Sequence, residues 1–427
     1  MERLFNMFKF IHAADVHLDS PLHKLDYYEG APKDEIRRAS RRAFENLVQA
    51  AISENVNFIV IAGDLYDGDW KDYNTGLYLV AQTTRLADAG IPVYIVAGNH
   101  DAASKITRKL RLPKNVSVFP SNKPATVSLD DLNVAIHGQS FAKPAVKKDL
   151  SKNYPDPLPG YFNIGVLHTC ASGRQGHEPY APCSPDGLRS RGYDYWALGH
   201  VHQHEILCDE PPIVFSGCIQ GRQIRETGPK GCVLVTVDDN SLPAHEFLPL
   251  DVIRWTITEV DANGAEGGYD VVDRFRRQLE RLMDKNEGLP LVTRVFIKGE
   301  TPAHTELLAN DARWCNEIRS AAIDSGSGRI WVEKVKFLTG LPPSEKNLQI
   351  KDAAVGELLT LFDEMAASPE EMKVLSEELE EIEKKIPKEL LESSENLKFK
   401  DPGWIEGILQ QVRPMLLQRL MRKGSSQ

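Results

Sequence analysis

The sequence contains few cysteines, and they follow none of the patterns that build a disulfide framework or a zinc ribbon. Six occur among 427 residues, with no CxxC pair and no regular spacing: Cys170, Cys183, Cys208, Cys218, Cys232 and Cys315. Such scattered positions argue against both classes of cysteine site. Reduced thiols in a cytoplasmic protein are the simplest interpretation.

The chain also lacks a long apolar run and an excess of positive charge. No stretch reaches the roughly 18 uninterrupted apolar residues of a membrane span, and the apolar run near the N-terminus stops at Asp15. The net charge is −10, so no global positive field would hold the protein on DNA. We therefore expect no membrane partner, and any surface for nucleic acid must lie in locally basic stretches.

What the chain does contain is more apolar sequence than one core can use. At 427 residues and 41% hydrophobic content it exceeds the roughly 250 to 300 residues at which single cores stop growing. Up to residue 250, short β-rich apolar runs alternate with helical or loop segments. The runs are Phe8–Ile11, Phe58–Ala62, Val93–Ala97, Val134–Ile136, Ile164–Leu167, Tyr195–Leu198, Ile213–Phe215 and Val233–Val237. This alternation predicts a layered α/β domain over residues 1–250.

Two further regions follow. Residues 251–340 predict a small second α/β domain, with strands at Arg254–Val260, Leu291–Lys298 and Ile330–Phe337 and helices at Tyr269–Lys285 and Thr305–Ala322. Residues 341–427 predict an acidic helical C-terminal region. Its first helix begins after Ser368, which has the character of an N-cap, and its last spans Trp404–Met421 with one apolar side.

Five polar clusters directly follow predicted strands of the first domain. They are Asp15-Val16-His17, Gly63-Asp64-Leu65-Tyr66-Asp67, Gly98-Asn99-His100-Asp101, His168, and Gly199-His200-Val201-His202. Each alone is weak, because a lone Asp-x-His or a lone His is more often a surface or structural residue. Together they fall where ligands gather in α/β folds, at the carboxyl ends of strands. Carboxylate, imidazole and carboxamide groups in one place suit a pair of Mn, Fe or Zn ions, with one carboxylate bridging both.

The amino-acid sequences of these clusters resemble the motifs of a known family. GDLYD, GNHD, IHGQSF and ALGHVH, spread over roughly the first 240 residues, are similar to motifs of the calcineurin-like metallophosphoesterases. Within that superfamily they look like the DNA-repair exonucleases of the SbcD and YhaO type. The resemblance implies a layered metallophosphoesterase β-sandwich flanked by helices, and a metal-dependent DNA exonuclease or phosphodiesterase.

The resemblance also implies the roles of individual residues. One metal would be held by Asp15, His17, Asp64 and His202, and the other by Asp64, Asn99, His168 and His200. The cofactor would be two divalent ions, with Mn²⁺ preferred. His100 would be left for catalysis, stabilising charge or protonating the departing oxygen.

The implied mechanism is in-line attack by a hydroxide that the two cations activate. Asp67 and Asp101 would orient the imidazoles of the metal ligands without binding a metal themselves. For Asp101 a helix N-cap before Ala102–Leu110 is an equal alternative, and some relatives carry His at the position of Asp67.

Basic residues just past His100 are the predicted DNA-binding patch: Lys105, Arg108, Lys109 and Arg111. A solvated face is the alternative for such runs. The predicted partners are DNA, an SMC-like coiled-coil ATPase subunit and, as a homodimer, a second copy of the chain. The helix Trp404–Met421 would dock on that ATPase or on the chain's own second domain.

Two other functions share this site chemistry. One is a small-molecule or protein phosphatase, or a cyclic-nucleotide phosphodiesterase. Only the two additional domains and the similarity to the family's sequence motifs favour a nuclease over these enzymes. The other is a non-catalytic scaffold that binds DNA or a partner. The complete ligand set argues against a degenerate site of that kind.

Overall fold

The structure is a computed structural model, and it describes residues 7–20, 33–67, 73–103, 111–171 and 180–342. In the C-terminal part it describes residues 357, 360–362, 364–365, 368–383, 401, 403–409 and 412. The chain divides into two compact units. The first is Met1–Thr256 with Gly288–Val292, and the second is Ile257–Glu287 with Thr293–Gln427.

The apolar runs of the first unit form two six-stranded sheets. One has the order β12-β11-β1-β2-β3-β4, with β1 Phe8–Ala13, β2 Phe58–Ala62, β3 Val93–Val96, β4 Val116–Val118, β11 Gly231–Val237 and β12 Pro243–Pro249. The other has the order β5-β6-β7-β8-β10-β9, with β5 Ala125–Leu129, β6 Val134–Gly138, β7 Phe162–His168, β8 Tyr195–Gly199, β9 Glu205–Asp209 and β10 Pro212–Phe215. In each sheet four neighbouring strands are parallel, namely β1 to β4 and β6, β7, β8 and β10.

The two sheets pack face to face over an aromatic core. The rings of Phe10 and Phe58 stack with centroids 5.0 Å apart, and Tyr195 of the other sheet meets Phe10 edge-on at 5.4 Å. His12 lies in the same layer, where its ring nitrogens bond the Tyr195 hydroxyl and the Leu198 carbonyl, both at 3.1 Å. Central strands buried on both faces explain why their sequences are continuous apolar runs without alternation.

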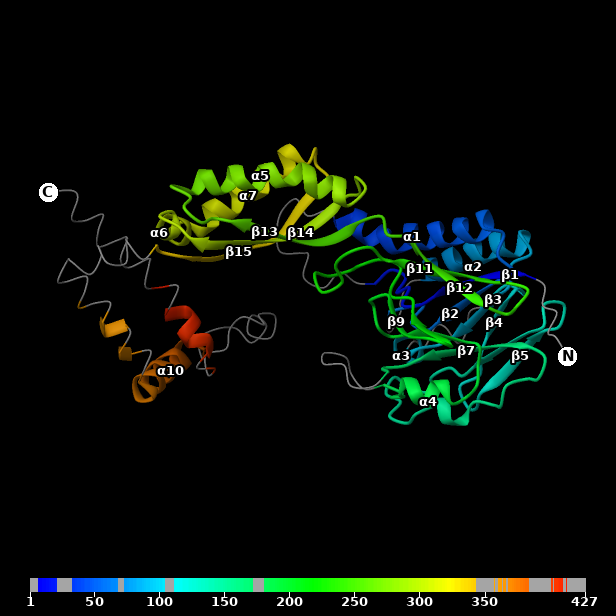
Figure 1. Cartoon of the computed structure of the whole chain (residues 1–427). Coiled ribbons are helices and arrows are strands. Elements are labelled where there is room, and N and C mark those ends of the chain that lie inside the picture. Colours follow the sequence, from blue (N-terminus) through cyan, green and yellow to red (C-terminus); the bar gives the residue numbers. More distant parts are fainter. Residues whose placement is uncertain are drawn as a thin grey trace. The chain divides into compact units, whose positions relative to one another are not determined.

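Helices cover the outer faces. The helices α1 Lys33–Ser53 and α2 Tyr73–Asp88 lie on the first sheet, where Phe44, Leu47 and Leu79 pack against strand residues (Figure 1). The shorter α3 Asn99–Ala103 and α4 Pro185–Arg189 are the remaining helices of the first unit's described residues, apart from one short 3₁₀ turn at Ser151–Asn153. The predicted α/β sandwich flanked by helices is confirmed.

The second unit contains a three-stranded sheet in the order β13-β14-β15. Its strands are β13 Arg254–Asp261, β14 Leu291–Glu300 and β15 Ile330–Gly340, and the first residues of β13 and β14 belong to the first unit. Its helices are α5 Gly268–Lys285, α6 His304–Ala309 and α7 Asp311–Ser325. The helices α5 and α7 lie on one face of the sheet (Figure 1). The single helix predicted over Thr305–Ala322 is two helices, because the backbone at Asn310 has φ −131° and ψ 43°, outside the helical range. The predicted boundaries at residues 250 and 340 stay predictions.

The C-terminal region is helical where it is described. Helix α10 spans Pro369–Glu383, and the Ser368 hydroxyl accepts a hydrogen bond of 3.3 Å from the Glu371 amide, as an N-cap does. Of the predicted Trp404–Met421 helix, residues 404–409 and 412 are helical and the others lie outside the described residues. Among the helices described, none has the length and apolarity to cross a membrane. All six cysteines lie within the described residues, and none of them forms a disulfide bond.

Candidate metal centre

The loops after β1 and β2 run side by side with a strained backbone. Three backbone hydrogen bonds of 3.0 Å join them: Asp15 to Gly63, His17 to Asp64 and Leu18 to Leu65. Asp15, His17 and Asp64 have left-handed φ values of 50°, 45° and 51°. For residues with a side chain this conformation costs roughly 1–3 kcal/mol and concentrates at functional sites. The paired loops hold these three side chains at the carboxyl edge of the first sheet.

Two glycines let the loops of both sheets meet. At Gly98, just before α3, a Cβ atom would lie 2.3 Å from Oδ1 of Asp64 and 2.9 Å from Cε1 of His168. At Gly63 it would lie 2.2 Å from Nδ1 of His168, and φ there is 100°. Both distances are far below van der Waals contact, so no side chain fits at either position. His168, at the end of β7, thereby reaches the residues that follow β2 and β3.

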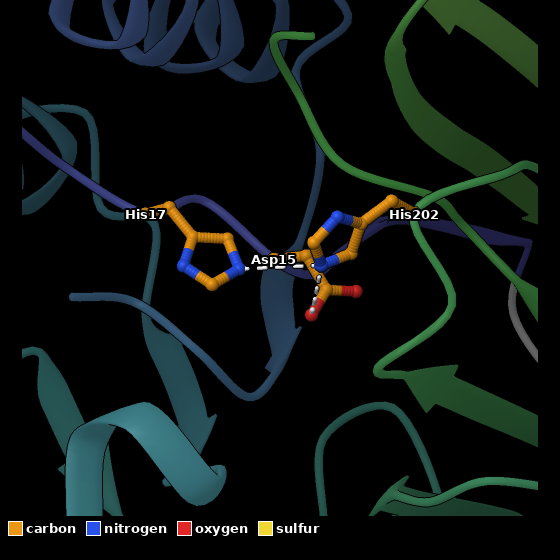
Figure 2. A group of neighbouring side chains, drawn as sticks. All are labelled: Asp15, His17 and His202. Carbon is orange, nitrogen blue, oxygen red and sulfur yellow. Dashed lines mark hydrogen bonds and ion pairs between the residues drawn. The ribbon is translucent and has the colours of Figure 1, made fainter. Parts of the chain in front are cut away.

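The structure brings Asp15, His17 and His202 together (Figure 2), with one ligand atom of each within 4.8 Å of the others. The Nε2 atoms of His17 and His202 lie 3.3 Å apart, and Nε2 of His202 is 3.9 Å from Oδ1 of Asp15. Nε2 of His17 is also 3.9 Å from Oδ2 of Asp64. These four residues are the predicted ligands of the first metal.

The predicted ligands of the second metal meet beside them. Nε2 of His168 lies 2.9 Å from Oδ1 of Asn99 and 3.4 Å from Oδ2 of Asp64. The His200 ring centroid is 5.1 Å from that of His168, and the His200 amide donates to Asp15 at 2.9 Å. Asp64 therefore contacts a predicted ligand of each metal, as a bridging carboxylate must.

The donor set fits divalent cations. The carboxylate of Glu226 accepts a hydrogen bond from Nδ1 of His202 at 2.8 Å, and the Ala62 carbonyl accepts one from Nδ1 of His168 at 2.9 Å. In each ring the neutral tautomer then leaves a lone pair on Nε2. These Nε2 atoms face carboxylate oxygens of Asp15 and Asp64, so a cation bound between them would take the imidazole nitrogens and the carboxylates as ligands.

The electrostatics of the centre agree with this fit. Burial, reinforced by the charge of Arg222, lowers the pKa of His17 to about 3, so its imidazole is neutral and able to coordinate. Burial also lowers the pKa of His168, but the charge of Asp64 outweighs it and raises that pKa to about 9. The site therefore favours positive charge beside Asp64, which a cation would supply.

His100 and Asp67 form a hydrogen-bonded pair at the rim of the centre. Nδ1 of His100 lies 2.7 Å from Oδ1 of Asp67, and the His100 ring stands edge-on to His17 with centroids 4.9 Å apart. The bond to Asp67 raises the pKa of His100, whose side chain keeps 40% of its surface exposed. The bond to Asp67 thus favours the protonated form of His100 and holds its ring next to the predicted metal ligands.

Asp101 lies within α3 and has a different set of contacts from those predicted. Its carboxylate accepts from the amides of Gly98 at 2.9 Å, Tyr66 at 2.9 Å and Leu65 at 3.2 Å. It contacts none of the imidazoles through a hydrogen bond assigned in the described residues, and it is the third residue of the helix, not the residue before it. Asp101 joins the loop after β2 to the GNHD turn.

Of the four residues of the predicted DNA-binding patch, the structure describes Arg111. Lys105, Arg108 and Lys109 lie outside the described residues, and Arg111 is exposed. Arg41, in α1, makes a two-pronged ion pair with Asp19, with contacts of 2.7 Å from Nε to Oδ1 and 2.5 Å from Nη2 to Oδ2. Arg41 thus braces the loop after β1.

Sequence reasoning missed Arg222 and Glu226, which lie between β10 and β11. Glu226 bonds His202, and Nη1 of Arg222 lies 3.1 Å from Oδ2 of Asp67. One signal was present. Strand β10 is parallel to β8 and adjacent to it, so polar residues beyond its carboxyl end belong beside His200 and His202.

Two family models match the chain. Residues 8–204 match the calcineurin-like phosphoesterases, and residues 255–340 match the middle domain of the metallophosphoesterase YhaO. The first range contains all the predicted metal ligands and catalytic groups: Asp15, His17, Asp64, Asp67, Asn99, His100, Asp101, His168, His200 and His202.

Curated relatives agree with these matches. The uncharacterized metallophosphoesterase YhaO of Bacillus subtilis is 34% identical over 297 residues, covering 69% of this chain and 72% of the relative. The DNA double-strand break repair protein Mre11 of Sulfurisphaera tokodaii is 23% identical, covering 69% and 74%. A component of the nuclease SbcCD of Staphylococcus saprophyticus is 25% identical, covering 64% and 74%. The chain therefore belongs to the calcineurin-like phosphoesterase family.

Proposed function

We propose that the protein is a metal-dependent DNA exonuclease or phosphodiesterase of DNA repair, working with two Mn²⁺ ions. The observation that carries the proposal is that five strand-end loops meet around Asp15 and Asp64, with His100 beside them. Relatives named for double-strand break repair and for nuclease activity support DNA as the substrate.

The residues divide into holding and reacting groups. Asp15, His17, Asp64 and His202 would hold one ion, and Asn99, His168 and His200 would hold the other together with Asp64. When bound, the two ions supply positive charge for the phosphoryl oxygens and lower the pKa of water.

His100 is assigned to the reacting phosphate. Because Nδ1 of His100 bonds Asp67, the ring is fixed and its Nε2 is the atom that would donate a proton to the departing oxygen. Asp67 acts as a positioning residue that keeps His100 protonated, and Asp101 keeps the two loops in register.

Substrate and partner surfaces complete the proposal. Lys105, Arg108, Lys109 and Arg111 would track the phosphates of DNA, since a protein of net charge −10 needs a local cationic path. An SMC-like coiled-coil ATPase is the proposed partner, with the helix starting at Trp404 as its docking element. The proposed domains are 1–250 for the nuclease, 251–340 as an accessory domain and 341–427 for partner binding.

A comparison of substrates tests the function. Protein loaded with Mn²⁺ should digest linear DNA and hydrolyse bis-p-nitrophenyl phosphate, with much slower cleavage of a phosphomonoester. Monoester cleavage that exceeds diester cleavage, with DNA left intact, would favour the phosphatase alternative. Absence of all three activities in metal-loaded protein would favour the scaffold.

A further inference from the structure

The loop between β10 and β11, residues 216–230, extends to the metal centre, where the charged side chains of Arg222 and Glu226 are largely shielded from solvent. Glu226 is 4% exposed and the Arg222 side chain 17%. Two hydrogen bonds join the loop to residues 253–255. Nε1 of Trp255 donates to the Gly221 carbonyl at 3.0 Å, and Nε2 of Gln220 donates to the Ile253 carbonyl at 2.6 Å. Its geometry is therefore built into the fold.

Glu226 divides its carboxylate between His202 and its own loop. Oε1 accepts from Nδ1 of His202 at 2.8 Å, while Oε2 accepts from the Arg222 amide at 2.7 Å. With Nδ1 engaged, the ring of His202 can rotate only at the expense of a charge-assisted hydrogen bond. Nε2 of His202 consequently stays directed at His17 and Asp15.

Arg222 extends this contact to the other side of the centre. Its Nη1 atom donates to Oδ2 of Asp67 at 3.1 Å and to Oγ of Ser20 at 3.0 Å, and its Nη2 atom lies 3.5 Å from Oε1 of Glu226. The Ser20 hydroxyl donates to the same oxygen of Asp67. Oδ1 of Asp67 is thereby left for His100.

Stability alone does not explain these charges. Burying a guanidinium and a carboxylate carries a desolvation penalty that their attraction often fails to recover, so a buried ion pair is weak evidence for stabilisation. Both side chains instead contact histidines of the centre. Glu226 bonds His202 directly, and Arg222 bonds Asp67, which in turn bonds His100.

We propose that Arg222 and Glu226 are positioning residues of the metal centre: Glu226 orients His202, and Arg222 fixes Asp67 and, through it, His100. The proposal deepens the proposed phosphodiesterase function and rests on it for its kinetic test. Its metal-binding test stands without that function.

The metal-binding test compares Glu226→Gln with Glu226→Asp by Mn²⁺ titration calorimetry on metal-free protein. The amide of Gln keeps the length needed to accept from Nδ1 of His202, whereas Asp keeps the charge but is shorter. Orientation through this bond predicts a loss of ~10- to 100-fold for Asp and a smaller loss for Gln, which keeps the bond but not its charge. Wild-type affinity of the Asp variant, or a loss confined to Gln, would overturn the role of Glu226.

The kinetic test uses Arg222→Lys with Mn²⁺-loaded protein and bis-p-nitrophenyl phosphate. We expect kcat to fall ~10-fold with KM unchanged. The double variant Arg222→Lys with Asp67→Asn should be no slower than Asp67→Asn alone, because the two residues act in series. A raised KM or additive losses would overturn this route and place Arg222 on the substrate instead.

Arg294→Lys is the matched control. Arg294 makes a two-pronged pair with Glu333 in the second unit, at 2.6 and 2.8 Å and with a similarly shielded side chain. It should lower the melting temperature about as much as Arg222→Lys and leave kcat and Mn²⁺ affinity unchanged. If the wild type cleaves no diester, the proposed function fails, while the calorimetric comparison still decides the role of Glu226.

Discussion

Substituting Gly98 by Ala probes how tightly the metal centre is packed. The added Cβ would lie 2.3 Å from Oδ1 of Asp64, 2.8 Å from its amide nitrogen and 2.9 Å from Cε1 of His168. Carbon needs roughly 3.5 Å from such neighbours, so Asp64 or the GNHD turn must move by about 1 Å. Oδ1 of Asp64 also accepts from the His100 amide at 2.9 Å, and the displacement would carry His100 with it.

Both stability and function should respond. Overpacking of this kind costs about 1–3 kcal/mol of unfolding free energy. A misplacement of ~1 Å in a reacting constellation costs ~100-fold in rate. We therefore expect Gly98→Ala to fold, to bind Mn²⁺ more weakly by calorimetry, and to hydrolyse bis-p-nitrophenyl phosphate ~100-fold more slowly.

Gly340→Ala is the control, because a Cβ there meets no atom within 4 Å and φ lies outside the left-handed region. It should match the wild type in melting temperature, metal affinity and rate. The packing argument is refuted if Gly98→Ala binds Mn²⁺ and turns over like the control.

Three further predictions follow from the same structure. His100→Ala should keep both metals by elemental analysis yet lose ~100- to 10,000-fold in turnover; half the metal content would make His100 a ligand. Reversing Arg108, Lys109 and Arg111 to Glu should weaken DNA binding and flatten its salt dependence without slowing small-diester cleavage, and unchanged DNA affinity would move the DNA path elsewhere. Burial lowers the pKa of His12 to about 3, below the ~6.5 of an unfolded chain, so unfolded protein binds more protons and stability falls as pH drops from about 6.5 toward 3. Between pH 7 and 5, urea unfolding of metal-free wild type should lose about 2 kcal/mol more than His12→Gln; equal losses would contradict this.

The sequence predicts the strands well and identifies polar residues that the structure brings together, because both leave local signals. Buried parallel strands are continuous apolar runs. Asp15, Asp64 and Asn99 follow such strands, and His168 is the last residue of one. The topology then brings these ends together, so order along the chain becomes proximity in space.

The features of the site and the fold that the sequence did not predict depend on contacts between segments distant in the chain. Arg222 and Glu226 lie in an irregular loop with no periodicity, and only the neighbouring positions of β8 and β10 place them at His202. The break at Asn310 and the three hydrogen bonds that the Asp101 carboxylate accepts are set by tertiary packing. Propensity is a weak guide at such positions.

The most direct test of the two-metal account counts Mn²⁺ ions per chain alongside diester hydrolysis, before and after chelation. Dialysed wild-type protein reloaded with Mn²⁺ should hold two ions per chain and hydrolyse bis-p-nitrophenyl phosphate, and excess chelator should abolish both. Asp64→Asn replaces the carboxylate that both sites would share by a neutral amide. This variant should therefore lose both ions together, not one of the two. Full activity in excess chelator, or one ion retained at wild-type affinity in Asp64→Asn, would contradict the assignment of Asp64 as the bridge of a dinuclear centre.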